Sequence, residues 1–229
     1  MKFGVVIFPG SNCDMDMIYV LESIMKKKVV RLWHKDTDLQ EADFIILPGG
    51  FSFGDYLRSG AIAKFSPIMK EIIGFANAGG YVMGVCNGFQ ILTESGLLPG
   101  ALLHNNSHKF ICKNVYLKTI TKNSLVTQLY GNTPIKIPIA HGEGKYFADE
   151  ETLESLIKND QILFKYCDKN GQVTEKGNPN GSSLNIAGIC NADRNVFGMM
   201  PHPERASDEE LTNQDGRILF ESILSSFVS

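Results

Sequence analysis

The chain has 229 residues, of which 43% are hydrophobic and 21% are charged, and its formal net charge at pH 7 is -3. This length is enough for one large α/β domain, or two small ones, with a sizeable core. The slight negative charge argues against nucleic-acid binding as the main role, and no stretch approaches the roughly 18 apolar residues needed to span a bilayer.

The first half of the chain alternates apolar strands with helical segments. We predict strands over residues 3–8, 29–33, 44–47 and 81–85, and helices over residues 14–25, 61–78 and 87–95, the second broken near Pro67. The strands are nearly continuous apolar runs, which are typical of a parallel sheet covered by helices on both faces.

After residue 103 the pattern changes. Residues 110–118 and 135–140 alternate more and predict antiparallel hairpin strands, residues 161–167, 182–192 and 196–200 predict a return to the sheet, and residues 215–227 predict a closing helix. No repeat or domain linker interrupts this order. We therefore expect one α/β domain over residues 1–229, with a mostly parallel central sheet and a small antiparallel excursion.

Five cysteines are scattered along the chain without CxxC spacing: Cys13, Cys86, Cys112, Cys167 and Cys190. Their odd number and wide separation favour reduced thiols over a disulfide framework or a zinc site. We therefore expect a cytoplasmic protein without a metal site, in which one thiol is available for chemistry and most of the others serve packing.

The stretch GVCNGFQ, residues 84–90, places Cys86 between two glycines at the end of a predicted strand. This is the spacing of a nucleophile elbow, in which a tight strand-to-helix turn raises the side chain above the sheet. The N-terminus of the following helix favours a thiolate there. The alternative is that Cys86 is a small packing residue beside a turn.

A thiolate nucleophile needs a base, and His202 is the best candidate. It lies in Pro-His-Pro-Glu directly after the predicted strand 196–200, and the two prolines hold it on a stiff corner. Glu204, two residues on, can accept from the imidazole N–H. The alternative is a turn with a surface histidine.

Backbone N–H groups near Cys86 predict an oxyanion hole. Gly50 follows the third predicted strand in Pro-Gly-Gly-Phe, and Asn87 follows the nucleophile itself. Gly-Gly after a strand is otherwise only a turn.

The motifs PGGF, GVCNGFQ and PHPE, in this order and spacing, resemble the class I glutamine amidotransferase family, whose triad runs Cys, His, Glu. Longer stretches resemble, within that family, the glutaminase subunits of a synthase of purine biosynthesis: FPGSNCD, GGFSFGDYLRSGAIA, AHGEGKY, NPNGS and GMMPHPER. The resemblance extends from residue 3 to about residue 227. It departs at His104, where the family pattern has Arg.

The resemblance implies a flavodoxin-like fold and a role for each matched residue. Cys86 would form a γ-glutamyl thioester, His202 would transfer protons, and Glu204 would fix the tautomer of His202. Gly50 and Asn87 would stabilise the oxyanion, and Gln90 would shape the glutamine pocket. Three further residues would lie in pocket or partner loops: Asp55, Arg58 and His141.

The resemblance also implies partners. The substrate would be L-glutamine, and ammonia would pass to a large synthase subunit in a complex with a small third subunit. No G-x-x-x-x-G-K-[S/T] motif appears, so we expect no cofactor in this chain, and ATP and magnesium on the synthase subunit. The alternatives are another cysteine hydrolase of similar fold, or a partner-binding module without catalysis.

Overall fold

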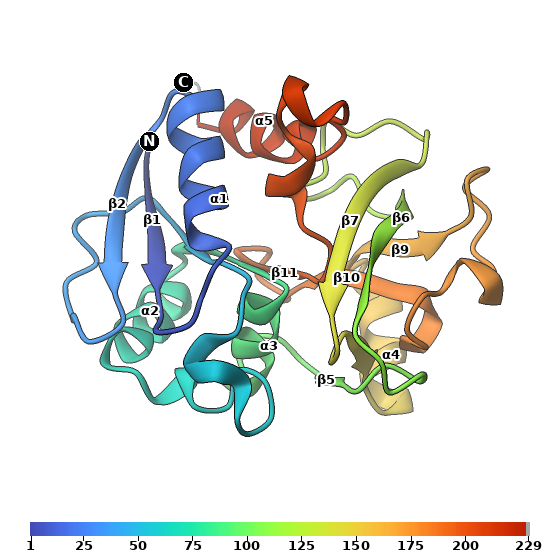
Figure 1. The fold of residues 1–229 in the computed structure, drawn as a ribbon, viewed down its shortest axis with the longest axis horizontal. Coiled ribbons are helices and arrows are strands. Elements are labelled where there is room, and N and C mark those ends of the chain that lie inside the picture. Colours follow the sequence, from blue (N-terminus) through green and yellow to red (C-terminus); the bar gives the residue numbers. More distant parts are fainter. Residues whose placement is uncertain (228–229) are drawn as a thin grey trace.

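A sheet of nine strands runs through residues 1–227, the part of the chain that the computed structural model describes, in the order β2-β1-β3-β4-β11-β10-β9-β6-β7 (Figure 1). Five neighbouring strands are parallel: β2 (Lys28–Trp33), β1 (Lys2–Ile7), β3 (Phe44–Leu47), β4 (Tyr81–Val85) and β11 (Val196–Met199). The others are antiparallel: β10 (Ile186–Cys190), β9 (Ile162–Cys167), β6 (Ile111–Thr119) and β7 (Ile135–His141).

The parallel half, on the left in Figure 1, follows from the apolar runs of the sequence. β1, β3 and β4 each contain four consecutive buried residues, as expected for strands covered on both faces. The strands predicted here are confirmed, with small shifts at their ends. Because these strands are parallel, their carboxyl ends meet at one edge of the sheet, where ligands bind in folds of this kind.

The antiparallel half is larger than the small excursion that the sequence predicted. β10 pairs with β11 and continues the same sheet through β9 and β6 to β7. The alternation along β7 predicted a strand with one solvated face, but such a pattern does not predict which strand will pair with it. A separate pair, β5 (Ala101–Leu103) and β8 (Lys145–Phe147), was not predicted, because three residues are too few to show a period.

Helices cover the parallel half. α1 (Asp14–Tyr19), which continues as a π-helix over Val20–Ile24, contacts β1; α2 (Pro67–Asn77) contacts β4; and α3 (Asn87–Glu94) contacts β3, β4 and β11. A 3-10 turn over Ala63–Phe65 precedes α2, so the predicted break at Pro67 is confirmed. The closing helix is α5 (Arg217–Ser225); it contacts the 3-10 turn Pro203–Ala206, which also contacts α1 (Figure 1).

α4 (Glu150–Lys158) was not among the predicted helices. Its sequence carried the signal nonetheless, because Asp149 caps it by accepting a 2.8 Å hydrogen bond from the Thr152 N–H. Acidic residues in the first turn and Lys158 in the last turn also suit the helix dipole. Its apolar residues Leu153, Leu156 and Ile157 have helical spacing, but they are few and only Leu156 is buried.

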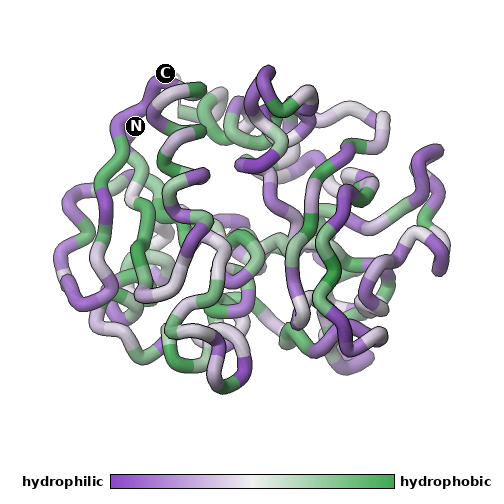
Figure 2. The backbone as a smooth tube through the Cα atoms, viewed as in Figure 1, coloured by the Kyte–Doolittle hydropathy of each residue, from purple (hydrophilic) through white to green (hydrophobic). Residues whose placement is uncertain are grey.

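Hydrophobic residues concentrate along the strands and hydrophilic residues in the outer loops, as the colours of the backbone in Figure 2 show. The buried core is continuous from the parallel half into the antiparallel half. No helix within residues 1–227 is long and apolar enough to cross a membrane.

The start of α3 depends on a glycine with no room for a side chain. A Cβ on Gly88 would lie 1.9 Å from the carbonyl oxygen of Leu47, at the end of β3. We expect Gly88→Ala to lower the free energy of unfolding by about 3 kcal/mol or more, because overpacking must displace backbone. Gly74→Ala, on an exposed position of α2 where a Cβ meets nothing within 4 Å, is the control and should stabilise by about 0.5–1 kcal/mol. Chemical denaturation of the two variants measures both, and equal stabilities would contradict the prediction.

Candidate active site

Cys86 stands on a strained turn between β4 and α3. Its φ of 51° and ψ of -107° are rare for a residue with a side chain, and such a conformation costs on the order of 1–3 kcal/mol. Gly84 and Gly88 allow the turn to close, since a Cβ on Gly84 would lie 2.5 Å from the backbone of Gly88. The geometry is that of a nucleophile elbow, as the GVCNGFQ stretch predicted.

The thiol of Cys86 lies at a small pocket of about 180 Å³. The side chain is 5% exposed, and Sγ lies 3.7 Å from the carbonyl oxygen of Ala140, near the end of β7. The residues that line this pocket are Gly50, Phe51, Asp55, Ser59, Cys86, Gln90, His104, Phe110, Ala140, His141, Gly142 and Glu143. The pocket therefore lies between the elbow and the antiparallel half of the sheet.

His202 and Glu204 form a buried pair at the end of β11. Nδ1 of His202 lies 2.6 Å from Oε1 of Glu204, and the two side chains are only 1% and 3% exposed. The backbone N–H of His202 donates to the carbonyl of Pro138, which ties the corner to β7. An ionised carboxylate can only accept, so Nδ1 donates and Nε2 is left for chemistry. The predicted contact between the two residues is present.

The charge state of His202 is set by its neighbours. Burial alone lowers the pKa of His202, but the carboxylate of Glu204 and the thiols of Cys86 and Cys13 outweigh it, so the pKa is raised well above 6.5. An imidazolium is therefore stable here, close to the thiol of Cys86.

Most of the cysteines other than Cys86 were expected to serve packing, but Cys13 lies beside the imidazole of His202. Its Sγ accepts a 3.2 Å hydrogen bond from Nη2 of Arg205. The signal for it was its position: FPGSNCD follows β1, whose carboxyl end shares an edge with those of β3 and β4. Donor atoms of Cys13, His202 and Glu204 lie within 4.8 Å of one another, close enough to hold a metal ion. The absence of a metal role stays a prediction.

Gly50 and Asn87, the two residues predicted to stabilise an oxyanion, both lie close to Cys86. Gly50 lines the Cys86 pocket, and Asn87 begins α3, where backbone N–H groups have no partner within the helix. The Asn87 side chain organises the site as well: Oδ1 accepts from the Ser52 N–H at 3.1 Å, and Nδ2 donates to Gln90 at 2.9 Å. Gln90, 4% exposed, in turn donates to the carbonyl of Glu143 at 2.6 Å.

Two carboxylates face the same pocket. Burial raises the pKa of Asp55, and the nearby charge of Glu143 adds to this, although hydrogen bonds from Ser59, Gly60 and Asn87 oppose the shift. Glu143 accepts from the Ser59 N–H at 3.1 Å and lies 3.4 Å from Nε2 of His104. Glu143 was not among the predicted site residues, although its motif AHGEGKY was noted.

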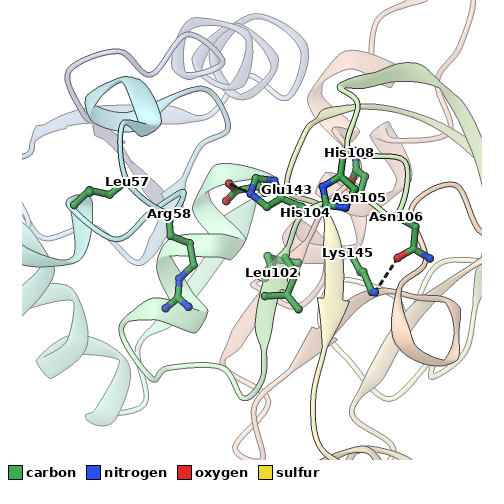
Figure 3. Close-up of a pocket in the computed structure, with 10 residues that line it drawn as sticks. Leu57, Arg58, Leu102, His104, Asn105, Asn106, His108, Glu143 and Lys145 are labelled. Carbon is green, nitrogen blue, oxygen red and sulfur yellow. Dashed lines mark hydrogen bonds and ion pairs between the residues drawn. The ribbon is translucent and has the colours of Figure 1, made fainter.

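Arg58 lies outside the Cys86 pocket. It pairs with Glu94 at 2.5 Å and lines a larger neighbouring cavity of about 570 Å³, drawn in Figure 3. His104 and Glu143 lie between the two cavities and line both. On the far side, Lys145 donates to Asn106, the dashed contact in Figure 3.

His141 is the last residue of β7 rather than part of a turn, and it is 3% exposed. Burial, and then the charge of His202, lower its pKa to about 4. Nδ1 lies 3.1 Å from Oδ1 of Asn105, and Nε2 has no hydrogen-bond partner among residues 1–227. The site thus holds two buried imidazoles in different protonation states.

Comparisons with known proteins agree with the sequence motifs. The model of the CobB/CobQ-like glutamine amidotransferase domain matches residues 1–219. Phosphoribosylformylglycinamidine synthase subunit PurQ of Acaryochloris marina is 54% identical over 230 residues, covering 100% of this chain and 98% of the relative. The same subunit of Koribacter versatilis is 56% identical over 225 residues, covering 98% and 97%.

Among solved structures, a chain in the structure of PurLQS from Thermotoga maritima matches with a TM-score of 0.87 and 42% identity, covering 99% of this chain and 98% of that chain. This match confirms the predicted fold class over nearly the whole chain.

His141 should make the stability of the fold depend on pH. Its pKa is about 4 in the folded chain and about 6.5 when exposed, so between these values the unfolded chain binds a proton that the folded chain does not. As pH falls through this window, the group should lower the free energy of unfolding by roughly 3 kcal/mol. Urea unfolding of wild type and His141→Asn across this range measures the effect, and the variant should show the weaker dependence.

His202 does not contribute to the pH dependence of the free energy of unfolding between the two pKa values of His141. Its raised pKa leaves it protonated in both states below 6.5, so its stabilising contribution is lost only at higher pH. Equal slopes in wild type and His141→Asn would show that His141 is not held neutral.

Proposed function

Since this chain belongs to the CobB/CobQ-like glutamine amidotransferase family, we propose that it is the glutaminase subunit of phosphoribosylformylglycinamidine synthase, which supplies ammonia for purine biosynthesis. The observation that carries the proposal is the elbow thiol of Cys86 beside the buried pair His202–Glu204. Together they supply a nucleophile that lines the Cys86 pocket, and a buried base with its orienting carboxylate close to the thiol.

The first half-reaction forms a thioester. The Cys86 thiolate attacks the side-chain carbonyl carbon of glutamine, and the N–H groups of Gly50 and Asn87 stabilise the oxyanion. His202, protonated at Nε2, gives its proton to the amide nitrogen as the C–N bond breaks, and ammonia leaves. The carboxylate of Glu204 stabilises the imidazolium before this step and holds the ring in place afterwards.

The second half-reaction restores the enzyme. His202, now neutral, takes a proton from a water molecule that attacks the thioester carbon. The C–S bond then breaks, glutamate is released, and Cys86 returns as a thiolate paired with the imidazolium. The raised pKa of His202 suits this resting pair.

The pocket also suits the α-amino end of glutamine. Asp55 and Glu143 place two carboxylates there; burial raises the pKa of Asp55 and the charge of Glu143 adds to this, so a cation beside them would be favourable. The α-ammonium group of glutamine supplies one. Gln90, held by Asn87 and the Glu143 carbonyl, forms a fixed polar wall of the same pocket.

The ammonia needs an acceptor, and this chain carries no P-loop motif for the ATP that activates one. We therefore place ATP and magnesium on a large synthase subunit, in a cytoplasmic complex with a small third subunit. The similarity to a chain of PurLQS from Thermotoga maritima supports a complex of this kind.

The alternatives from the sequence are weaker. A non-catalytic module would have no need of the strained φ at Cys86 or of the buried His202–Glu204 pair. Another cysteine hydrolase would not explain 54–56% identity to glutaminase subunits along nearly the whole chain. Ammonia release from glutamine, measured beside hydrolysis of an unrelated ester and peptide, separates the three functions.

The roles of the imidazole and the carboxylate predict unequal losses. His202→Asn should lower kcat by roughly 10²–10⁴-fold, because the ring transfers protons in both half-reactions. Glu204→Gln should cost less, since it keeps a hydrogen-bond acceptor for Nδ1. Steady-state ammonia release by both variants, with Cys86→Ala as the inactive control, measures the order. A larger loss in Glu204→Gln would reverse the two roles.

Partner binding should stimulate turnover. The Ser59–Glu143 hydrogen bond joins the loop 51–59 to the segment 141–144, so a partner that docks on one moves both. The Gln90–Glu143 hydrogen bond ties the same segment to α3. Because Gly50 directly precedes this loop, docking can align its N–H with the oxyanion, a gain of roughly 10²–10³-fold in kcat.

Ammonia release by the isolated chain, then with purified synthase subunits and nucleotide, measures the stimulation. Full activity of the chain alone, unchanged by the partners, would contradict the proposed stimulation by partner docking but would leave the glutaminase function intact.

A further inference from the structure

The second buried imidazole of the site, that of His141, has an unused nitrogen. Nε2 is shielded from solvent and has no hydrogen-bond partner within residues 1–227, a property it shares with Nε2 of the catalytic His202. Buried polar atoms are normally satisfied, so an unpaired one on a residue that lines the Cys86 pocket calls for a partner that is absent from the free chain. The triad chemistry does not use His141.

The tautomer of the neutral His141 ring is fixed by Asn105, which is fully buried. The amide nitrogen of Asn105 donates to two carbonyls, those of Lys109 and His141, so its Oδ1 must be an acceptor. Oδ1 faces Nδ1 of His141 at 3.1 Å and also accepts from the Gly144 N–H. The ring therefore carries its proton on Nδ1, and Nε2 presents a bare lone pair.

The position of the ring is equally fixed. His141 lines the same pocket as Cys86, and Sγ of Cys86 lies 3.7 Å from the carbonyl of the preceding residue, Ala140. The ring packs under Gly144, where an added Cβ would come within 2.2 Å of its atoms. His141 also lies close enough to His202 for the charge of one ring to act on the other.

We propose that Nε2 of His141 accepts a hydrogen bond from the side-chain amide nitrogen of bound glutamine, and thereby selects the amide of the substrate over the carboxylate of the product. This inference rests on the proposed glutaminase function. An amide nitrogen has two N–H groups to donate, whereas an ionised carboxylate has none and would place a negative oxygen against the lone pair.

The same contact orients the leaving group. When Cys86 attacks, the amide nitrogen becomes pyramidal and gains a basic lone pair. An N–H held by His141 turns that lone pair toward the proton on His202, which transfers as the C–N bond breaks. His141 takes no proton itself, so it acts as a positioning residue. Once ammonia has left and glutamate has formed, the contact is lost, which favours product release.

The test compares substrates that differ only in the donor. L-glutamine and the γ-methyl ester of L-glutamate react through the same thioester, but the ester lacks the N–H group. His141→Asn keeps a donor for Asn105 and removes the acceptor at the Nε2 position, whereas His141→Gln places an acceptor near that position. Each variant is assayed in the complex with its synthase subunits.

For His141→Asn we expect kcat/KM for glutamine to fall by about 10–100-fold and kcat/KM for the ester to stay within about twofold of wild type. Inhibition by glutamate should strengthen in the same variant. His141→Gln should recover most of the activity on glutamine. Such a change in the ratio of amide to ester turnover cannot come from a general loss of packing.

A parallel fall on both substrates in His141→Asn, or no fall on either, would overturn the role of His141 while leaving the proposed function intact. Failure of the wild-type complex to release ammonia from glutamine would overturn the proposed function and this inference with it.

A direct measurement does not depend on how the His141 variants fold. In the Cys86→Ala chain with ¹⁵N-labelled histidine, glutamine binds without reacting. Its addition should shift the Nε2 resonance of His141 in the direction of a hydrogen-bonded acceptor, and glutamate should not. Equal shifts with the two ligands would also overturn the proposal.

Discussion

The close approach of α3 to the end of β3 is the constraint on which the site depends. Gly88 lies so near the Leu47 carbonyl that no side chain fits, and this contact closes the turn that forces Cys86 to a positive φ. The strained turn raises the thiol above the sheet and places it at the N-terminus of α3. The buried strands on either side of β4 supply the rigidity that holds this conformation against its cost.

The two buried histidines of the site differ in charge because a different side chain faces Nδ1 of each ring. Glu204, a carboxylate, keeps His202 charged in spite of burial, whereas Asn105, a neutral amide, leaves burial to dominate at His141. The charged ring suits proton donation, and the neutral ring suits acceptance of a hydrogen bond. The antiparallel half of the sheet makes this arrangement possible, since β7 brings His141 and the Ala140 carbonyl to the elbow.

Strong local signals predicted the parallel half and the triad. Apolar runs bounded by Pro-Gly or Gly-Gly predicted β3 and β4, and the Gly-x-Cys-x-Gly spacing predicted the elbow, because these features depend on neighbours in the chain. Cys13, Glu143 and Asn105 were missed because their contacts in the site are with residues far away in the sequence. Asn105 contacts His141, 36 positions away, and Cys13 contacts Arg205, 192 positions away. A local sequence pattern does not encode such contacts.

By itself, the sequence determined which residues could react: a thiol on a tight turn, a histidine between prolines and a carboxylate two residues on. Short-range sterics and the fixed φ of proline are enough for that. Only the tertiary structure decided how those groups are charged and which cavity each loop residue lines. Arg58 lines the larger neighbouring cavity, whereas His141 lines the Cys86 pocket. These properties depend on burial and on partners from distant strands, so they exist only once the two halves of the sheet have packed together.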